Sequence, residues 1–368
     1  MTDLEKLCSR VTEAADCAVI TDDVNRRYFT AMKSSAGTLV VFPEKAYFII
    51  DFRYIEKAKK TVTACEVILQ DKLYEQINSL IEKHGAKTVS VNADTCTLSE
   101  LIAYQQKLNA EVIADTKLAE IIREIRTVKS QEQIDKIIKA QRIAEKGFAH
   151  MLDFIKVGRT EKEIQLELDY YMLKNGAEAL SFDTIALSGS NTSLPHGVPS
   201  DKKVESGEFV LMDFGATYDG WHSDMTRTVC VGKPSDKMKF VYETVLTAQL
   251  AALDAVKAGM SGKALDKIAR NIITEAGYGD NFGHSLGHGV GVEFHEDPWV
   301  SFVSEENTGV LMVPGMMFTI EPMVNMGSDE IYTDEIDEWT VRTEDGLPSA
   351  QWEVTVLVTE TGCEVICW

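Results

Sequence analysis

The stretch that decides the fold of this chain is VLMDFGATYDGWHSDMTRTV, residues 210–229. Apolar and β-branched residues lie on both sides of Asp219-Gly220, and this pattern predicts two strands joined by a two-residue hairpin turn. With that turn, Tyr218 faces Trp221 across the ribbon. The register of the whole hairpin follows from this one pair, because each further step moves one residue back and one forward.

Two aspartates of the ribbon share one face. Gly215 lies opposite Asp224, and Asp213 is two residues from Gly215. Asp213 and Asp224 are therefore diagonal neighbours, with Cβ atoms roughly 7–8 Å apart. Two carboxylates at that separation repel each other unless a positive charge lies between them. One or two divalent cations would supply that charge; the alternative is a pair of solvated aspartates on an exposed hairpin face.

Length and charge limit the classes of function. The chain has 368 residues and 45% hydrophobic content, which is enough for a large core and favours two domains over one. It carries 58 acidic against 37 basic residues, a formal net charge of -21. Such an acidic surface repels phosphate backbones and anionic lipid, so we expect neither nucleic-acid binding nor membrane binding.

The sequence also predicts a reduced, cytoplasmic protein. No apolar run comes near the roughly 20 residues that a membrane-spanning helix needs. The first residues, MTDLEK, have neither the charge nor the apolar stretch of a signal peptide. The seven cysteines are an odd number and include no Cys-x-x-Cys pair, which argues against a disulfide framework.

The first third of the chain alternates strand and helix patterns. Strands are expected at residues 18–20, 37–42, 46–51 and 87–91, and helices at 54–60, 72–84 and 98–107. This alternation predicts a small α/β domain. No Gly-x-Gly-x-x-Gly follows a strand, so a nucleotide-phosphate loop is not expected.

A domain boundary is predicted between residues 127 and 128, because a long helical pattern begins directly afterwards. Ser130 is a suitable N-cap for a helix over residues 131–155, and Thr160-x-x-Glu163 is a capping box for the next. About a hundred residues later, a helix over 235–256 is again followed by a Gly-containing turn and a second helix ending near Gly277. Either the second domain is built from two related halves with a site where they meet, or two ordinary helix caps coincide.

Four of the seven histidines lie in two short segments. His196 lies between two prolines, and His284, His288 and His295 fall within twelve residues. The four glycines between 283 and 291 make a helix improbable there, so His284 and His288 are not a helical zinc pair. The glycines instead indicate a close approach of the backbone to some other group.

Two further carboxylates lie in apolar runs that look like strands. They are Glu321 in MMFTIEPM and Glu353 in QWEVTVLV. An acid buried inside such a strand is costly unless it is paired or ligated, whereas on a half-exposed strand it would face solvent. Four carboxylates and one imidazole (Asp213, Asp224, His288, Glu321, Glu353) form an oxygen-rich set that suits Mn²⁺, and also Co²⁺ or Zn²⁺. The four negative charges of the carboxylates balance the charge of two dications, whereas they exceed the charge of one.

With these residues in place, the chain resembles the pita-bread metallopeptidases, which include Xaa-Pro aminopeptidases, Xaa-Pro dipeptidases (prolidases) and methionine aminopeptidases. The resemblance covers nearly the whole chain. The segments NRRYFT, residues 25–30, and DFRY, residues 51–54, resemble the creatinase-type N-terminal domain, which methionine aminopeptidases lack. The implied fold is a creatinase-like α/β domain, residues 1–127, followed by a pseudo-symmetric α+β pita-bread catalytic domain, residues 128–368.

The resemblance also implies a role for each site residue. The family's five metal ligands fall on the five residues above, and Asp224 and Glu353 match the carboxylates that bridge both metals. Catalytic roles fall on His196 (proton transfer and substrate contact), on His295 (contact with the scissile carbonyl) and on Glu321 (proton shuttle to the leaving amine). His284 matches the histidine beside the pocket for the residue after the cut bond.

The last motif departs from the Xaa-Pro enzymes. They usually have Arg two residues before the bridging Glu and Asp directly after it, where this chain has Gln351 and Val354. The surrounding segments 338–353 and 293–298 look more like methionine aminopeptidases. These changes leave the metal set intact but put the fine specificity of the pocket in doubt.

The resemblance predicts a homodimeric, dinuclear metal-dependent exopeptidase that uses a metal-bridging hydroxide to release an N-terminal residue preceding proline. An Xaa-Pro aminopeptidase is expected first. The alternatives are a prolidase restricted to dipeptides, a methionine-type aminopeptidase and a non-catalytic peptide-binding homologue. A substrate with proline at its second position needs a pocket shaped for the ring, because proline lacks the amide N–H of other residues.

Overall fold

The computed structural model describes residues 1–194, 197–303, 311–327, 331–333, 341–343 and 347–367. The chain divides into two compact units, residues 1–126 and 127–368, so the division falls within helix α6 (Lys117–Thr127) and one residue before the expected position. Among the described residues, no helix combines the length and the apolar character that a membrane span requires.

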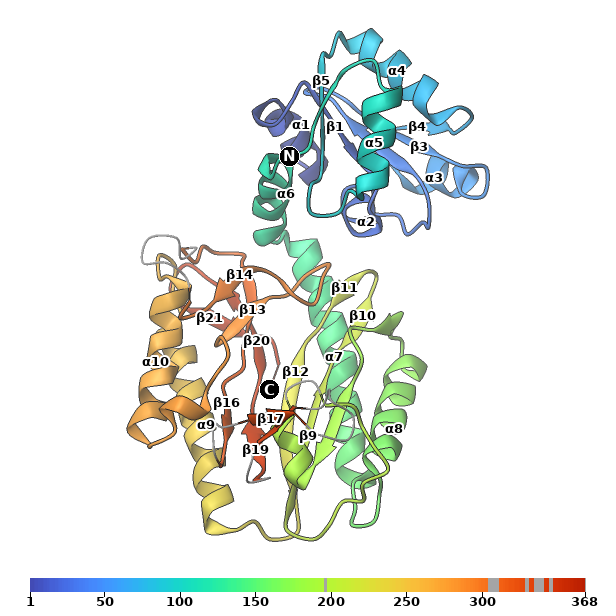
Figure 1. Cartoon of the computed structure of the whole chain (residues 1–368). Coiled ribbons are helices and arrows are strands. Elements are labelled where there is room, and N and C mark those ends of the chain that lie inside the picture. The colour runs from blue at the N-terminus through green and yellow to red at the C-terminus, as the bar shows by residue number, and fades with distance from the viewer. Residues whose placement is uncertain (195–196, 304–310, 328–330, 334–340, 344–346, 368) are drawn as a thin grey trace. The chain divides into compact units, whose positions relative to one another are not determined.

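The first unit is a six-stranded mixed sheet covered by helices on both faces (Figure 1). Its strands have the order β4-β3-β2-β1-β5-β6, with parallel pairing at β3–β4, β1–β5 and β5–β6 and antiparallel pairing elsewhere. The elements are α1 (Asp3–Arg10), β1 (Cys17–Ile20), α2 (Asp23–Thr30), β2 (Thr38–Val41), β3 (Ala46–Ile50), α3 (Ile55–Thr61), β4 (Glu66–Leu69), α4 (Leu73–His84), β5 (Thr88–Val91), α5 (Leu98–Lys107), β6 (Glu111–Ile113) and α6 (Lys117–Thr127).

Two separate apolar cores lie on the two faces of this sheet. One contains residues of α1, α3 and α6, and the other contains residues of α4 and α5. The predicted α/β domain is therefore confirmed, although α1, α2, β4, β6 and α6 were not anticipated as elements. Strands β4 and β6 are short, lie at the sheet edges and are not fully buried, so their sequences lack the continuous apolar run that marks β1 to β3.

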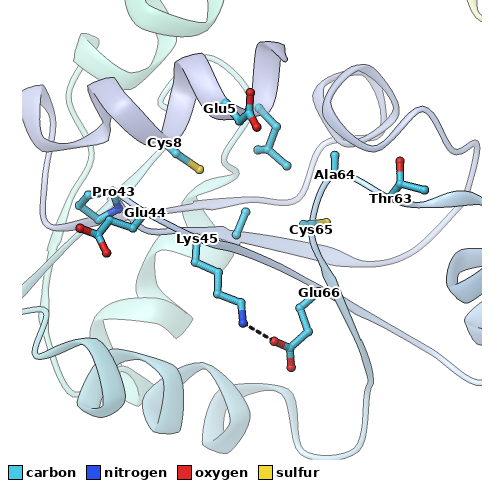
Figure 2. A pocket seen from close by; sticks show the side chains of 11 residues that line it. Glu5, Cys8, Pro43, Glu44, Lys45, Thr63, Ala64, Cys65 and Glu66 are labelled. Atoms are coloured by element: carbon cyan, nitrogen blue, oxygen red, sulfur yellow. Dashed lines mark ion pairs between the residues drawn. The ribbon is translucent and has the colours of Figure 1, made fainter. Parts of the chain in front are cut away.

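The first unit also has a pocket between α1, the β2–β3 turn and the segment before β4 (Figure 2). Lys45 and Glu66 form an ion pair of 2.6 Å at its edge, and both side chains are exposed. Burial raises the pKa of Cys8 to about 11 and that of Cys65 to about 12. Both thiols are therefore protonated at neutral pH and are poor nucleophiles.

The second unit has two helix pairs flanking a set of short sheets (Figure 1). The sheets have the orders β12-β9-β8, β11-β10-β7, β14-β13-β15-β20-β21, β16-β19 and β17-β18. The helices are α7 (Gln131–Phe154), α8 (Glu161–Lys174), α9 (Asp236–Ala255) and α10 (Gly262–Glu275). The strands are β7 (Ala179–Leu180), β8 (Ile185–Ser188), β9 (Glu208–Phe214), β10 (Ala216–Tyr218), β11 (Trp221–His222), β12 (Met225–Val231), β13 (Gly287–Gly289), β14 (Glu296–Val300), β15 (Met317–Ile320), β16 (Met323–Asn325), β17 (Ile331–Thr333), β18 (Val341–Thr343), β19 (Ser349–Gln351), β20 (Val354–Val358) and β21 (Cys363–Val365).

The expected internal repeat is present, and equivalent hydrogen bonds define it. In the first half, the N–H of Gly158 donates to the carbonyl of Val204 at 2.9 Å, between α7 and α8. In the second half, the N–H of Gly259 donates to the carbonyl of Met312 at 2.8 Å, between α9 and α10. Both glycines have positive φ, 91° and 83°, and each precedes a side-chain-capped helix. The coincidence of two unrelated caps is therefore excluded.

Candidate metal centre

The hairpin that supplies the first two carboxylates has the predicted register. Tyr218 pairs with Trp221, and Asp213 pairs with Thr226 in the same register farther along the ribbon. Asp219 and Gly220 have φ values of 50° and 82°, the positive values that a two-residue hairpin turn of this kind requires. Asp213 lies on β9, and Asp224 lies in the break between β11 and β12.

The other two carboxylates do not lie inside strands, so that prediction was wrong. Glu321 directly follows β15, and Glu353 lies between β19 and β20. Ile320 pairs with Val354 on one side of the break and β16 pairs with β19 on the other, which places Glu321 opposite Glu353. Pro322 lacks the N–H that a continuous ladder would need, so the pairing is interrupted where the two acids meet.

His288 comes from β13, which pairs with β14 and β15. Its Nδ1 lies 3.1 Å from the carbonyl of Gly289, and because a carbonyl can only accept, Nδ1 is the donor. Nε2 is then the atom that faces Glu321 at 3.3 Å and Asp224 at 3.8 Å. Burial alone would lower the pKa of this imidazole, but the hydrogen bond and charge of Glu321 raise it, so a cation bound at Nε2 would take the place of a proton. This orientation is typical of a histidine whose second nitrogen binds a metal.

The glycines around His288 explain its placement. A Cβ on Gly287 would lie 1.9 Å from the carbonyl oxygen of Thr319, and one on Gly289 would lie 2.2 Å from that of Asp297. The close approach expected from this Gly-rich segment is therefore an approach to neighbouring strand backbone. The glycines let β13 pass between its neighbours and bring the imidazole to the carboxylates.

The five side chains converge on one point in the second unit. Asp213, Asp224 and Glu353 each offer a carboxylate oxygen, and these oxygens lie within 4.8 Å of one another. Ligand atoms of His288, Glu321 and Glu353 form a second group of the same size. Asp224, His288 and Glu353 are buried, with 2–5% of their surface exposed. Asp224 is therefore not a solvated residue on an exposed hairpin face, and Asp213 is partly buried with its Oδ1 atom enclosed.

The electrostatics of the group favour compensation of its negative charge by protons or by cations. Desolvation and the neighbouring Glu321 raise the pKa of Asp213 to about 7. Desolvation and the adjacent carboxylates raise the pKa of Asp224 and of Glu353 well above their ordinary values. Oδ1 of Asp213 is buried and has no hydrogen-bond partner among the described residues. Hard oxygen donors with one imidazole and an orphaned carboxylate oxygen fit divalent cations.

Glu321 differs from the other three acids. Burial alone would raise its pKa, but the hydrogen bond and positive charge of His288, followed by the charges of His284 and His295, lower it below its ordinary value. Its Oε2 also accepts a hydrogen bond from Nε2 of Gln351 at 3.1 Å. Glu321 is therefore the carboxylate of this group that most readily remains ionised.

Several supporting residues were not anticipated from the sequence. Thr226 donates its hydroxyl to Oε2 of Glu353 at 2.8 Å. The buried guanidinium of Arg227 donates to the backbone carbonyl of Glu353 and lies 4.5 Å from the ring centre of Trp352. Both residues belong to the hairpin stretch, but their partners lie more than a hundred positions away, which no local pattern reveals.

Of the other three predicted histidines, the structure describes two, His284 and His295. The rings of His295 and His288 meet edge to face at 4.1 Å, and a nitrogen of His295 belongs to a third close group with Asp224 and His288. Nδ1 of His284 donates to the carbonyl of Ser285 at 2.8 Å, and its buried Nε2 has no hydrogen-bond partner among the described residues. His196 lies outside the described residues.

Comparison with known proteins agrees with this geometry. Residues 135–360 match the sequence profile of Metallopeptidase family M24, and residues 4–128 match the Creatinase/Prolidase N-terminal domain. The chain belongs to metallopeptidase family M24. It joins the pita-bread fold of that family to a creatinase-type N-terminal domain, so the fold predicted from the sequence is confirmed.

Two relatives cover nearly the whole chain. The chain is 36% identical to the Xaa-Pro dipeptidase of Pyrococcus furiosus over 98% of its own length and 96% of that protein. The solved structure of the Xaa-Pro dipeptidase from Bacillus anthracis is 37% identical, has a TM-score of 0.89, and is matched over 99% of this chain and 96% of that chain.

A third relative is named for a different activity. The X-Pro aminopeptidase from Thermotoga maritima is 33% identical, with a TM-score of 0.84 and coverage of 96% of both chains. This member of family M24 is thus a metallo-exopeptidase by relationship, and its relatives include both dipeptidases and an aminopeptidase.

Proposed function

We propose that this protein hydrolyses the peptide bond between an N-terminal residue and proline, and that its preferred substrates are dipeptides. From the sequence alone, an Xaa-Pro aminopeptidase was expected first and a dipeptidase second. The relatives support the reverse order, because dipeptidases from Pyrococcus furiosus and Bacillus anthracis match the chain with slightly higher identity than the Thermotoga maritima aminopeptidase. The observation that supports the reaction most strongly is the buried convergence of four carboxylates and one imidazole.

We assign the metal ligands to Asp213, Asp224, His288, Glu321 and Glu353; these residues would hold two divalent cations, and on the resemblance Asp224 and Glu353 would be the acids shared between them. Two divalent cations, when bound, supply activation of a water nucleophile and stabilisation of the negative charge that develops on the carbonyl oxygen. Mn²⁺ is our first choice, because the set is dominated by carboxylate oxygens, and Co²⁺ or Zn²⁺ would also suit it.

Glu321 is the residue we assign to proton transfer. Its lowered pKa keeps it ionised, so it can accept a proton and then donate it to the leaving amine. Gln351 holds one of its oxygens, which restricts the orientation of the carboxylate. When the C–N bond breaks, the proline nitrogen must gain one proton to leave as a neutral amine, as any amide nitrogen must.

The histidines bind and orient the substrate in this proposal. His295 is exposed at the edge of the carboxylate group, where it can reach the scissile carbonyl. His284 has a buried Nε2 free to accept a hydrogen bond, consistent with a place beside the residue after the cut bond. His196 is assigned to proton transfer and substrate contact on the resemblance alone.

A panel of three peptides tests the proposal. Purified protein is freed of metal, divided, and reloaded with Mn²⁺, Co²⁺ or Zn²⁺, and release of the first residue is measured from Ala-Pro, Ala-Pro-Ala and Met-Ala-Ser. We expect cleavage of Ala-Pro with a kcat/KM at least about tenfold above that for Ala-Pro-Ala, a difference of about 1.4 kcal/mol in the barrier. Met-Ala-Ser should remain intact.

Other outcomes identify the alternatives. Preference for Ala-Pro-Ala would support an Xaa-Pro aminopeptidase in place of a dipeptidase, and cleavage of Met-Ala-Ser would indicate a methionine-type enzyme. If no peptide is cleaved and metal analysis finds no bound cation, the protein is a non-catalytic homologue and the proposed function is wrong.

Three finer proposals accompany the function. We assign residues 1–127 to the creatinase-like domain and residues 128–368 to the catalytic domain, in agreement with the residues that match the two family profiles. A cytoplasmic location is consistent with seven free cysteines. A homodimer is proposed from the resemblance, and light scattering on the purified protein measures its mass directly.

A further inference from the structure

Lys129 is a buried cation next to the second unit's first helix, and the mechanism above does not use it. Its side chain is 0% exposed, and its Nζ lies 2.7 Å from Oε1 of Glu296, whose side chain is 6% exposed. A buried ion pair is a costly way to gain stability, because both charges lose their hydration. Such a pair is better explained by what it holds in place.

Backbone contacts fix the lysine end of the pair. The N–H of Lys129 donates to the carbonyl of Gly315 at 2.9 Å, and Val128 forms an isolated bridge with Met316. Met316 leads directly into β15, the strand that ends at Glu321. Lys129 is therefore attached to the part of the sheet that presents one of the assigned metal ligands.

The glutamate end of the pair lies beneath a glycine-rich turn. Oε2 of Glu296 accepts a hydrogen bond from the N–H of Glu293 at 3.4 Å. A Cβ placed on Gly291 would lie 2.2 Å from Oε1 of Glu296, so only glycine lets the turn pack on this carboxylate. The carbonyl of Gly291 in turn accepts a hydrogen bond from the N–H of His222 at 2.8 Å. Residues 291–296 are thus held between the hairpin and Lys129.

His295 lies in this segment, immediately before Glu296, and its ring contacts that of His288 at 4.1 Å. We propose that Lys129 is a positioning residue that, by pairing with Glu296, holds the segment 291–296 so that His295 faces Asp224 and His288. This inference rests on the proposed function, which gives His295 its contact with the scissile carbonyl. Lys129 does not touch the reacting atoms.

The expected effect follows from the geometry. Without the ammonium group, the buried carboxylate of Glu296 loses the cation that balances its charge, which favours movement toward water or uptake of a proton. Either change releases the turn that packs on it, and His295 moves with the turn. Because a displacement of about 1 Å at a catalytic group can cost about 100-fold in rate, we expect Lys129→Met to lower kcat for Ala-Pro by about 10- to 100-fold.

A double-mutant cycle with His295 separates positioning from stability. Lys129→Met is compared in the natural background and in a His295→Ala background, with Lys129→Arg as the conservative variant. If Lys129 acts through His295, its loss lowers kcat by about 10- to 100-fold in the first background and by less than about threefold in the second. Metal content should stay the same in every variant, and Lys129→Arg should recover part of the rate.

Lys136→Met is the matched control. Lys136 lies on α7 of the same unit and pairs with Glu132 and Asp219, away from residues 291–296. We expect this variant to keep the natural kcat. An equal loss of rate from Lys129→Met in both His295 backgrounds, or no loss in either, would overturn the inference.

A measurement without substrate distinguishes this inference from the proposed function. Amide hydrogen exchange of residues 290–296 should be faster in Lys129→Met than in the natural protein, while exchange in β9 and β12 is unchanged. This result is available even if no Xaa-Pro peptide is cleaved, and unchanged exchange would count against the pair as a positioning device. Should Lys129→Met fail to fold, Glu296→Gln, which keeps the shape of the side chain, takes its place in the cycle.

Discussion

The two ladders that supply the assigned metal ligands differ in how far apart their strands lie in the sequence. Asp213 and Asp224 come from a hairpin whose strands are joined by the two residues Asp219 and Gly220. Glu321 and Glu353 come from strands separated by more than thirty residues, and they meet where the pairing of β15 with β20 gives way to that of β16 with β19. One ladder is defined by a local turn and the other by tertiary contacts.

Carboxylates of the same chemical type are thus brought to one site by different kinds of contact, local in one ladder and long-range in the other. The hairpin places its aspartates on one face through pleat and register. The second ladder places its glutamates through the pairing of distant strands, which Pro322 interrupts. Loss of a ligand should nevertheless have the same consequence in both ladders, because all four acids are assigned to the cations.

The largest effect is expected from the two acids assigned to bridge the cations, one from each ladder. Asp224→Asn and Glu353→Gln keep the size of the side chain but remove its charge. Because the cations supply several kcal/mol of transition-state stabilisation, we expect each change to lower kcat/KM for Ala-Pro by about 10³-fold or more. Bound metal, measured on the same samples by elemental analysis, should fall below two ions per chain.

Asp219→Asn serves as the control for these changes, because it removes a carboxylate from the same hairpin without touching the cation ligands. Asparagine also tolerates the positive φ of this position. Metal content and activity should remain at natural values. If Asp224→Asn kept its activity while Glu353→Gln lost it, the two ladders would not contribute equally and the assignment of two shared bridges would be wrong.

The next largest effect is expected in how the stability of the metal-free protein depends on pH. The pKa of Asp213 is raised from 3.8 to about 7, so the folded protein retains a proton that the unfolded chain has lost above about pH 4. Its contribution to stability is complete below that pH and is lost as the pH rises through about 7. Asp224 and Glu353 are shifted in the same direction. We therefore expect the melting temperature of the metal-free protein to fall between about pH 5 and pH 8.

Added cation should reverse this trend. Ligands must be deprotonated to bind metal, so Mn²⁺ should raise the melting temperature more at about pH 8 than at about pH 5. Asp213→Asn supplies the comparison, because an amide does not titrate and the metal-free variant should show a shallower dependence on pH. A metal-free natural protein that becomes more stable through this range would contradict the assigned burial of the carboxylates.

The same contrast explains what could be predicted from the sequence. The hairpin register and the four long helices follow from local signals: a two-residue turn, capping residues and helical periodicity. The pairing of Glu321 with Glu353, the hydroxyl of Thr226 on Glu353, and the contact of Gln351 with Glu321 depend on strands brought together by the tertiary fold. No periodicity within either segment contains that information.

The glycines illustrate the same limit. Their number between residues 283 and 291 predicted a close approach, and the structure has one, but the neighbour is the backbone of β14 and β15. The glycine content predicts that another group approaches this segment closely, but it does not identify that group. The five candidate ligands were collected from their residue types and apolar surroundings, and the resemblance to a known family added a role for each, because a family pattern records long-range contacts that a single sequence does not display.

The smallest effect is expected at the turn itself. Gly220 has a φ of 82°, and an alanine there must adopt the left-handed region, so we expect Gly220→Ala to lower the free energy of unfolding by about 1–2 kcal/mol. Gly277→Ala is the matched control, because Gly277 has a φ of 89° and its added Cβ would meet no atom within 4 Å. Urea unfolding should give similar losses for the two variants. If the hairpin orders Asp213 and Asp224 through its turn, Gly220→Ala should weaken Mn²⁺ binding in addition and Gly277→Ala should not; equal metal affinity in both variants would show that packing against the second ladder is sufficient to hold the aspartates in place.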